Sequence, residues 1–332
     1  MELNSDVIVG IDDSAQSGEA AAWALKEMRG SGQRLRLIHV IAPAPLYESG
    51  PHGADEVQRN AAGHEVVTRL RDRLIELDAS HPQGASGTEI LTEVIVGDPA
   101  EQLCTLDYDT ALFVLGHHGA GQINSRRIGT ISFGLPGHLL SSVLVHSTRG
   151  GSEFDDPAAH PTLTDDAGVG GADGAGGADG ADGADGVDGG RSGSAGVIVG
   201  LDTSEYAGIA ALDAASFAVD NGVPLRLLVG IDALEDPTAR DLAEADLAWL
   251  RSEFPRVDAQ LEFRAGDPAD MLIRASAHAD LVVIGKRGIG AFASMTSQLG
   301  RTSSAVLSAA LSSVLLVTYR SDPRLANRGQ IR

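Results

Sequence analysis

Cysteine is almost absent from this sequence, since Cys104 is the only one in 332 residues. A single cysteine excludes a disulfide within the chain and any metal site built from several cysteines, and it suits a reducing compartment. The first ten residues, MELNSDVIVG, have neither the basic start nor the apolar stretch of a signal peptide, and no run of about 18 apolar residues occurs. We therefore expect a soluble cytoplasmic protein with no membrane contact.

Lysine is nearly as rare, with Lys26 and Lys286 alone, and the formal net charge is -21. Residues 1–150 carry 19 acids and 11 bases, residues 151–195 carry 10 and 1, and residues 196–332 carry 17 and 13. Binding to nucleic-acid phosphates requires clustered lysine and arginine. The composition therefore excludes a general nucleic-acid binder.

A low-complexity segment divides the chain. Residues 171–190 contain nine Gly, five Ala, five Asp and one Val. Such a composition buries too little apolar surface to offset chain entropy, so we expect residues 151–195 to form a flexible acidic linker.

The two sides of this linker repeat each other. The start VIVGIDDS, residues 7–14, recurs as VIVGLDTS at 197–204, and the turn GDPA at 97–100 recurs at 266–269. Order and spacing are kept, apart from 21 residues that the second copy lacks. The pattern indicates a tandem duplication with domains at 1–150 and 196–320, followed by a tail at 321–332.

Each copy alternates short apolar runs with longer amphipathic stretches, which predicts a doubly wound α/β fold with a parallel sheet covered on both faces. Strands are expected at about 6–11, 34–41, 89–96, 111–116 and 142–146, and again at 196–201, 224–230, 259–264, 280–285 and 313–318. Helices of the first copy are expected at about 15–29, 55–78, 99–107 and 130–140, and Gly134, Pro136 and Gly137 predict that the last one breaks after about one turn.

Ligands of such sheets bind at the carboxyl ends of the strands. Asp12 and Asp202 end the first strand of each copy, where they either accept hydrogen bonds from a ligand or only shape the turn. Strand four of the first copy ends in Gly116, and Gly129 and Thr130 open the next helix. Glycines and a helix start favour a bound anion, although no Walker A motif is present.

These residues resemble the universal stress proteins, whose nucleotide-binding members carry G-x2-G-x9-G-[S/T] after strand four. Gly116, Gly119, Gly129 and Thr130 match that spacing. The resemblance covers both copies, about 270 of 332 residues. The second copy departs from the pattern at its end: Gly285 and Gly288 are followed by eleven residues, then Gly300, Arg301 and Thr302. Arg301 either contacts a phosphate or fills the pocket, and Thr302 replaces the missing hydroxyl.

The resemblance implies an adenine-nucleotide alpha hydrolase-like fold with two five-stranded sheets of order 3-2-1-4-5. It also implies an ATP or other adenine-nucleotide site, with Mg²⁺ as an accompanying ion and Val40 near the adenine. Family members pair domains through strand five, which allows pairing within the chain or a homodimer.

We expect a non-catalytic, nucleotide-responsive stress protein with an unidentified protein partner. Two alternatives stay open, an interaction protein that no longer binds nucleotide and a slow metal-dependent ATP hydrolase. His117 and His118 are predicted to be solvated loop residues, with no metal site.

Overall fold

A computed structural model describes residues 6–43, 52–118, 128–148, 154, 195–202, 204–230, 237–288 and 299–331. The first copy contains β1 (Asp6–Ile11), α1 (Ala15–Glu27), β2 (Leu35–Ile41), α2 (His52–Ser80), β3 (Ile90–Val96), α3 (Pro99–Thr105), η1 (Asp107–Asp109), β4 (Thr110–Gly116), α4 (Thr130–Gly134), η2 (Leu135–Gly137) and β5 (Ser142–His146). The second contains β6 (Val197–Leu201), α5 (Glu205–Asn221), β7 (Leu225–Gly230), α6 (Pro237–Glu253), β8 (Ala259–Arg264), α7 (Pro268–Ser276), β9 (Leu281–Gly285), α8 (Arg301–Ala309), β10 (Ser313–Val317) and α9 (Arg324–Ile331).

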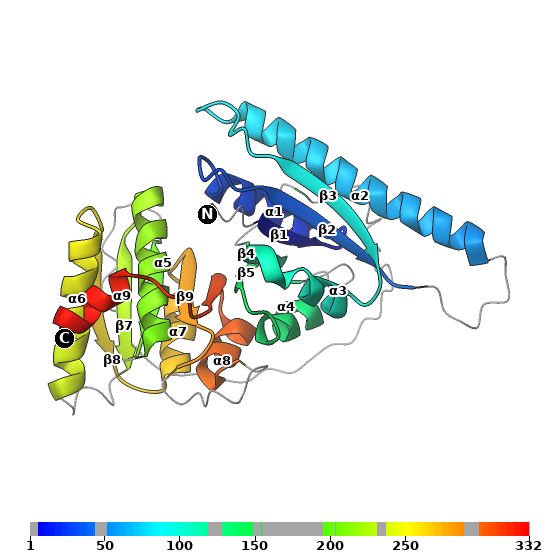
Figure 1. Ribbon diagram of the computed structural model, residues 1–332. Coiled ribbons are helices and arrows are strands. Elements are labelled where there is room, and N and C mark those ends of the chain that lie inside the picture. Colours follow the sequence, from blue (N-terminus) through cyan, green and yellow to red (C-terminus); the bar gives the residue numbers. More distant parts are fainter. Residues whose placement is uncertain are drawn as a thin grey trace, which may run out of the picture.

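The strands form one sheet of ten, in the order β3-β2-β1-β4-β5-β10-β9-β6-β7-β8 (Figure 1). Each copy therefore has the expected order 3-2-1-4-5, and strands within a copy run parallel because helical crossovers connect them. The two copies meet at β5 and β10, which pair antiparallel with Leu144 opposite Leu315. The predicted doubly wound fold is confirmed, and the two sheets are continuous.

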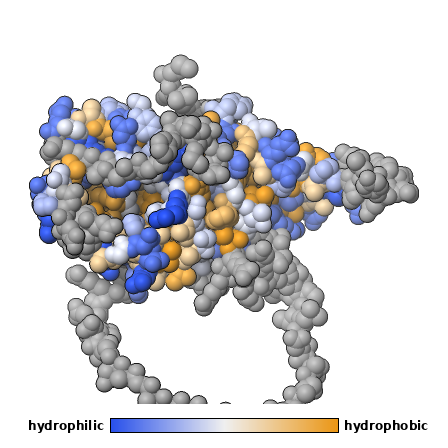
Figure 2. All heavy atoms as spheres, turned by 90° about the horizontal axis from the view of Figure 1, so that it is seen from below, coloured by the Kyte–Doolittle hydropathy of each residue, from blue (hydrophilic) through white to orange (hydrophobic). Residues whose placement is uncertain are grey.

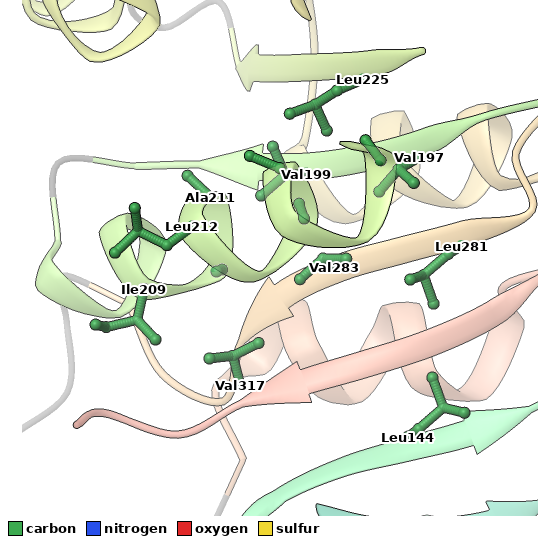
Figure 3. Close-up of a cluster of buried hydrophobic side chains, with 14 of the residues drawn as sticks. Leu144, Val197, Val199, Ile209, Ala211, Leu212, Leu225, Leu281, Val283 and Val317 are labelled. Carbon is green, nitrogen blue, oxygen red and sulfur yellow. The ribbon is translucent and has the colours of Figure 1, made fainter. Parts of the chain in front are cut away.

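Helices cover both faces of this sheet, and successive residues of a strand enter opposite cores. In β1, Val7 and Val9 pack on the face of α1 and α5, whereas Ile8 packs on the face of α3 and α7. Both cores extend from one copy into the other. Figure 3 shows Leu144 of β5 and Val317 of β10, on neighbouring strands of the two copies, as members of one of these cores.

The predicted helix at 130–140 ends early, as its residues indicate. Helix α4 stops at Gly134, and a 3-10 turn containing Pro136 follows. Proline lacks the amide hydrogen of a helix interior and clashes with the preceding turn, so the helix does not continue. The apolar residues Phe133, Leu140 and Leu311 are exposed. Figure 2, a view from below, shows apolar side chains among polar ones on the surface.

Part of the segment predicted as a tail forms helix α9, which packs on α5 and α6. Arg328 makes a buried bidentate ion pair with Asp246 of α6, with Nε–Oδ1 and Nη2–Oδ2 distances of 2.8 and 2.7 Å. Its Nη1 also donates to the Ser204 carbonyl oxygen at 2.8 Å. Paired charges of this geometry offset the cost of their burial, so the helix is held at a defined place.

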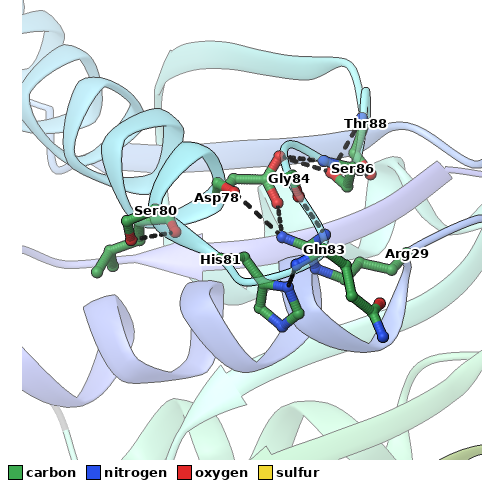
Figure 4. Close-up of polar contacts among 9 residues, drawn as sticks. Arg29, Asp78, Ser80, His81, Gln83, Gly84, Ser86 and Thr88 are labelled. Atoms are coloured by element: carbon green, nitrogen blue, oxygen red, sulfur yellow. Dashed lines mark hydrogen bonds and ion pairs between the residues drawn. The ribbon is translucent and has the colours of Figure 1, made fainter.

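In the first copy, polar contacts hold the turn after α2 against α1 (Figure 4). Arg29, two residues after α1, pairs with Asp78, and its Nη1 donates to the Gly84 carbonyl oxygen at 2.8 Å. Asp78 in turn accepts from the backbone N–H and the hydroxyl of Ser86, at 2.6 and 2.8 Å. Arg29 and Asp78 together thus hold the connection between α2 and β3. Within the described ranges, no helix has the length and apolar character to cross a membrane.

We predict that the junction of β5 and β10 contributes strongly to stability. Leu144→Ala removes a side chain with no exposed surface, and such truncations cost about 2–5 kcal/mol. Leu140→Ala, four residues earlier, truncates a side chain that is 74% exposed and should change the free energy of unfolding by less than about 0.5 kcal/mol. Denaturant unfolding followed by circular dichroism compares the two; equal midpoints would contradict the structure at this junction.

Candidate functional site

Each copy has a cavity at the carboxyl ends of its first and fourth strands, where an open α/β sheet binds ligands. The second-copy cavity measures about 570 Å³ and the first-copy cavity about 220 Å³. Among the predicted residues, the first is lined by Asp12, Val40, Gly116, Gly129 and Thr130, and the second by Asp202, Gly285, Gly288, Gly300, Arg301 and Thr302. The predicted site residues that the structure describes therefore line two cavities, one in each copy. Gly119 lies outside the described residues.

Both aspartates shape a turn as well as lining a cavity. Asp12 Oδ1 accepts from the Ser14 backbone N–H at 3.2 Å and from the Ser14 hydroxyl at 2.5 Å. Asp202 makes the same two contacts with Ser204, and each serine caps the following helix. The D-x-S pattern therefore has a structural role in both copies. That role fixes the carboxylate at the cavity wall.

Glycine is required where strand four passes the first helix. A Cβ on Gly116 would lie 2.9 Å from the backbone carbonyl carbon of Gln16, and one on Gly285 would lie 2.8 Å from Tyr206 Cβ. A Cβ on Gly288 would lie 2.5 Å from Asp202 Oδ2. The glycines thus let the loop approach both the helix and the carboxylate.

Two serines that the sequence analysis missed tie each glycine loop to the next helix. Ser132 Oγ donates to the Gly116 carbonyl oxygen at 2.6 Å, and Ser303 Oγ donates to that of Gly285 at 2.8 Å. The sequence signal was available, because both serines stand three residues after the helix-opening glycine of their copy. The same bond therefore joins the end of strand four to the following helix in both copies.

The polar residues at the two helix starts differ. Thr130 opens α4, and Arg301 opens α8 with 95% of its side chain exposed. Its guanidinium lies 4.0 Å from Asp267, so Arg301 stands at the rim and does not fill the cavity. Thr302, whose hydroxyl was expected to replace the one missing at position 301, also lines the cavity.

The opposite wall of the first cavity is apolar, with Val40 beside Ile11 and Leu103. At the position of Val40 the second copy has Gly230, which lines its cavity. The missing side chain contributes to the larger space there. Such a wall accepts a flat apolar group, while the aspartate and the glycine loop supply polar contacts at the other end.

The prediction that both histidines are solvated is wrong for His117. It is 7% exposed, its ring meets that of His118 edge-on at 4.3 Å, and its Nδ1 lies 3.0 Å from His118 Nε2. Burial, with a smaller contribution from His118, lowers the pKa of His117 from 6.5 to about 4. His118 lines the first cavity. In the part of the chain described, no three metal-ligating side chains gather.

Comparisons with known proteins confirm the resemblance found in the sequence. The sequence model of the universal stress protein family matches residues 4–145 and 196–318. A universal stress protein of Mycolicibacterium smegmatis is 27% identical over 331 residues, which cover 95% of this chain and 97% of that protein. Universal stress protein Rv1996 of Mycobacterium tuberculosis is 24% identical, with coverage of 97% and 98%. A universal stress protein structure from Archaeoglobus fulgidus, 18% identical, superposes with a TM-score of 0.61 and covers 96% of this chain and 99% of its own, which shows the shared fold.

We predict that His117 makes the protein sensitive to acid. Its pKa is lower in the folded chain than in the unfolded chain, so the unfolded state binds the proton first and stability falls as the pH drops from 6.5 towards 4. Between pH 6.5 and 4.5 this one group should account for roughly 2 kcal/mol. His117→Gln should reduce the loss measured by denaturant unfolding, whereas His64→Gln, at an exposed position of α2, should not. Equal losses in wild type and His117→Gln would contradict the prediction.

Proposed function

We propose, from the premise that this chain belongs to the universal stress protein family, that it binds an adenine nucleotide and acts as a non-catalytic regulatory protein. The observation that carries the proposal is the repeated cavity, which joins an aspartate, a glycine loop and a helix start in both copies. An apolar wall opposite an anion-accepting loop suits a base at one end and phosphates at the other. The family resemblance favours ATP over other adenine nucleotides.

In the first copy, Val40 would contact the base and Asp12 a ribose hydroxyl. The phosphates would lie against the backbone of Gly116 and Gly129 and the hydroxyl of Thr130. α4 has only five residues, so the loop rather than a helix dipole supplies these contacts. Mg²⁺ would enter with the triphosphate, held by the nucleotide itself.

In the second copy, Asp202 takes the place of Asp12. Gly285, Gly288 and Gly300 form the loop, and Arg287, Arg301 and Thr302 stand where a phosphate chain would run. Two guanidinium groups and a hydroxyl favour several anionic oxygens over one. With about 570 Å³, this cavity falls in the range of sites that enclose whole small-molecule ligands, and the first falls below it. We therefore expect the tighter binding in the second copy.

The non-catalytic role is supported by the groups at the cavities. Among the described lining residues of the two cavities, His118 is the one histidine that could act as a general base, and it lines the first cavity only. We propose that the nucleotide acts by stabilising the paired copies, a state that a protein partner then recognises. The single cysteine supports placing this function in a reducing compartment such as the cytoplasm.

We predict a thermal stabilisation by ATP. A ligand at about 100 times its dissociation constant adds roughly 2.7 kcal/mol and raises the midpoint by a few degrees. Unfolding is followed with 1 mM ATP, AMP, cyclic AMP or GTP, and each shift is taken relative to the same variant without ligand. Asp202→Ala should remove most of the ATP shift, and Asp12→Ala a smaller part.

Asp241→Ala is the matched control, since Asp241 is exposed on α6, away from both cavities. An ATP shift that survives Asp12→Ala and Asp202→Ala together would place binding elsewhere. No shift with any nucleotide would favour the interaction protein. Turnover of ATP that His118→Ala abolishes would instead favour the hydrolase.

A further inference from the structure

Lys286, one of only two lysines in the chain, lies buried where the two copies meet. It is 6% exposed, and its Nζ donates to the carbonyl oxygens of Leu139 and Ser141 at 2.9 and 2.5 Å. Lys286 follows β9 in the second copy, whereas both acceptors precede β5 in the first. A buried ammonium is costly unless hydrogen bonds replace its water, so this contact specifies one arrangement of the two copies.

The acceptors belong to a rigid part of the first copy. Asp107 accepts from the backbone N–H groups of Leu140 and Ser141, the latter at 3.1 Å, and so holds the turn before β5. Burial lowers the pKa of Lys286 to about 8, although the charge of Asp107 raises it in part. The side chain therefore carries its charge at neutral pH and presents it to fixed carbonyl groups.

The backbone of the same residue builds the second-copy glycine loop. Lys286 N–H donates to the Val317 carbonyl oxygen at 2.8 Å, and the Lys286 carbonyl oxygen accepts from Gly300 N–H at 2.9 Å. Its neighbours Gly285 and Arg287 line the cavity, but Lys286 does not. The backbone of Lys286 thus forms hydrogen bonds within the second copy, beside its cavity, and its side chain forms hydrogen bonds with the first copy.

At the equivalent position of the first copy, no such link joins the residues that the structure describes. His117 corresponds to Lys286, and its carbonyl oxygen likewise accepts from Gly129 N–H at 2.8 Å. Its ring, however, turns to His118, and its buried Nε2 has no hydrogen-bond partner among the described residues. The second-copy loop is therefore anchored on the first copy through Lys286, and no reciprocal contact from His117 is found among the described residues.

We propose that Lys286 is a positioning residue for the second-copy site, and that nucleotide binding there and pairing of the two copies strengthen each other through it. The inference rests on the proposed nucleotide function. The anchor holds Gly285, Arg287 and Gly300 in place before the ligand arrives, which removes part of the ordering cost of binding. Because coupling between two equilibria is reciprocal, a bound nucleotide must tighten the contact of Lys286 by the same factor.

The first test measures ATP affinity of the full chain by titration calorimetry, with Asp12→Ala in every protein so that the second site is the one observed. Lys286→Met keeps an unbranched side chain one atom shorter and removes its charge, and it should weaken ATP binding by about fivefold or more. Lys26→Met is the matched control, because it changes the other lysine, whose side chain is 63% exposed, and it should bind ATP as the parent does.

The second test needs no variant and so remains available if Lys286→Met folds poorly. Mass spectrometry follows the acylation of the two lysines by an amine reagent in the wild-type chain. Lys286 should react far more slowly than Lys26, and ATP should slow it further by the factor that calorimetry gives. Because Lys286 does not line the cavity, bound ATP cannot shield it by direct contact.

The outcomes separate this inference from the function on which it rests. Wild-type protein that binds no nucleotide would overturn the proposed function and the coupling with it. ATP affinity unchanged by Lys286→Met, or an acylation rate at Lys286 unchanged by ATP, would overturn the coupling alone and leave nucleotide binding in place. Equal reactivity of Lys286 and Lys26 without ligand would show that the buried contact itself is absent.

Discussion

The antiparallel pairing of β5 with β10 is the contact on which the rest of the structure depends. A parallel sheet of five strands has an open edge at strand five, with unpaired backbone groups and apolar side chains on both faces. In this chain the second copy closes that edge, and both core layers run through the junction. Neither copy buries its strand-five residues alone, so their packing is a property of the whole chain.

Closing the edge also buries groups that normally stay in water. His146 at the end of β5 lies near Trp23, its Nδ1 is 3.1 Å from the Ser313 hydroxyl, and burial lowers its pKa to about 4. Lys286 keeps its charge by binding carbonyl groups of the other copy. The two copies therefore share one strand order but differ in their buried polar contacts.

The residues that shape the fold and those that shape the cavities are largely the same. Asp12 and Asp202 form turns with the capping serines, and Gly116 and Gly285 let strand four pass the first helix. Their structural role is enough to account for the similarity between the copies at these positions. The groups that do differ, Val40 against Gly230 and Thr130 against Arg301, are the ones that separate the two sites chemically.

The sequence by itself determined the duplication, the parallel doubly wound fold and the position of both cavities, and the strand order followed from its resemblance to the family. Buried parallel strands leave uninterrupted apolar runs, and Pro136 ends α4 through the geometry of its own ring, so local patterns suffice. Only the tertiary structure decided that Arg328 docks on Asp246, that His117 is buried, and that Lys286 reaches Leu139. The ion pair and the lysine contact join residues 82 and 147 positions apart, and the burial of His117 follows from how the chain packs around it. No periodicity or spacing in the sequence predicts these contacts or this burial, because they depend on how the folded helices and strands pack against one another.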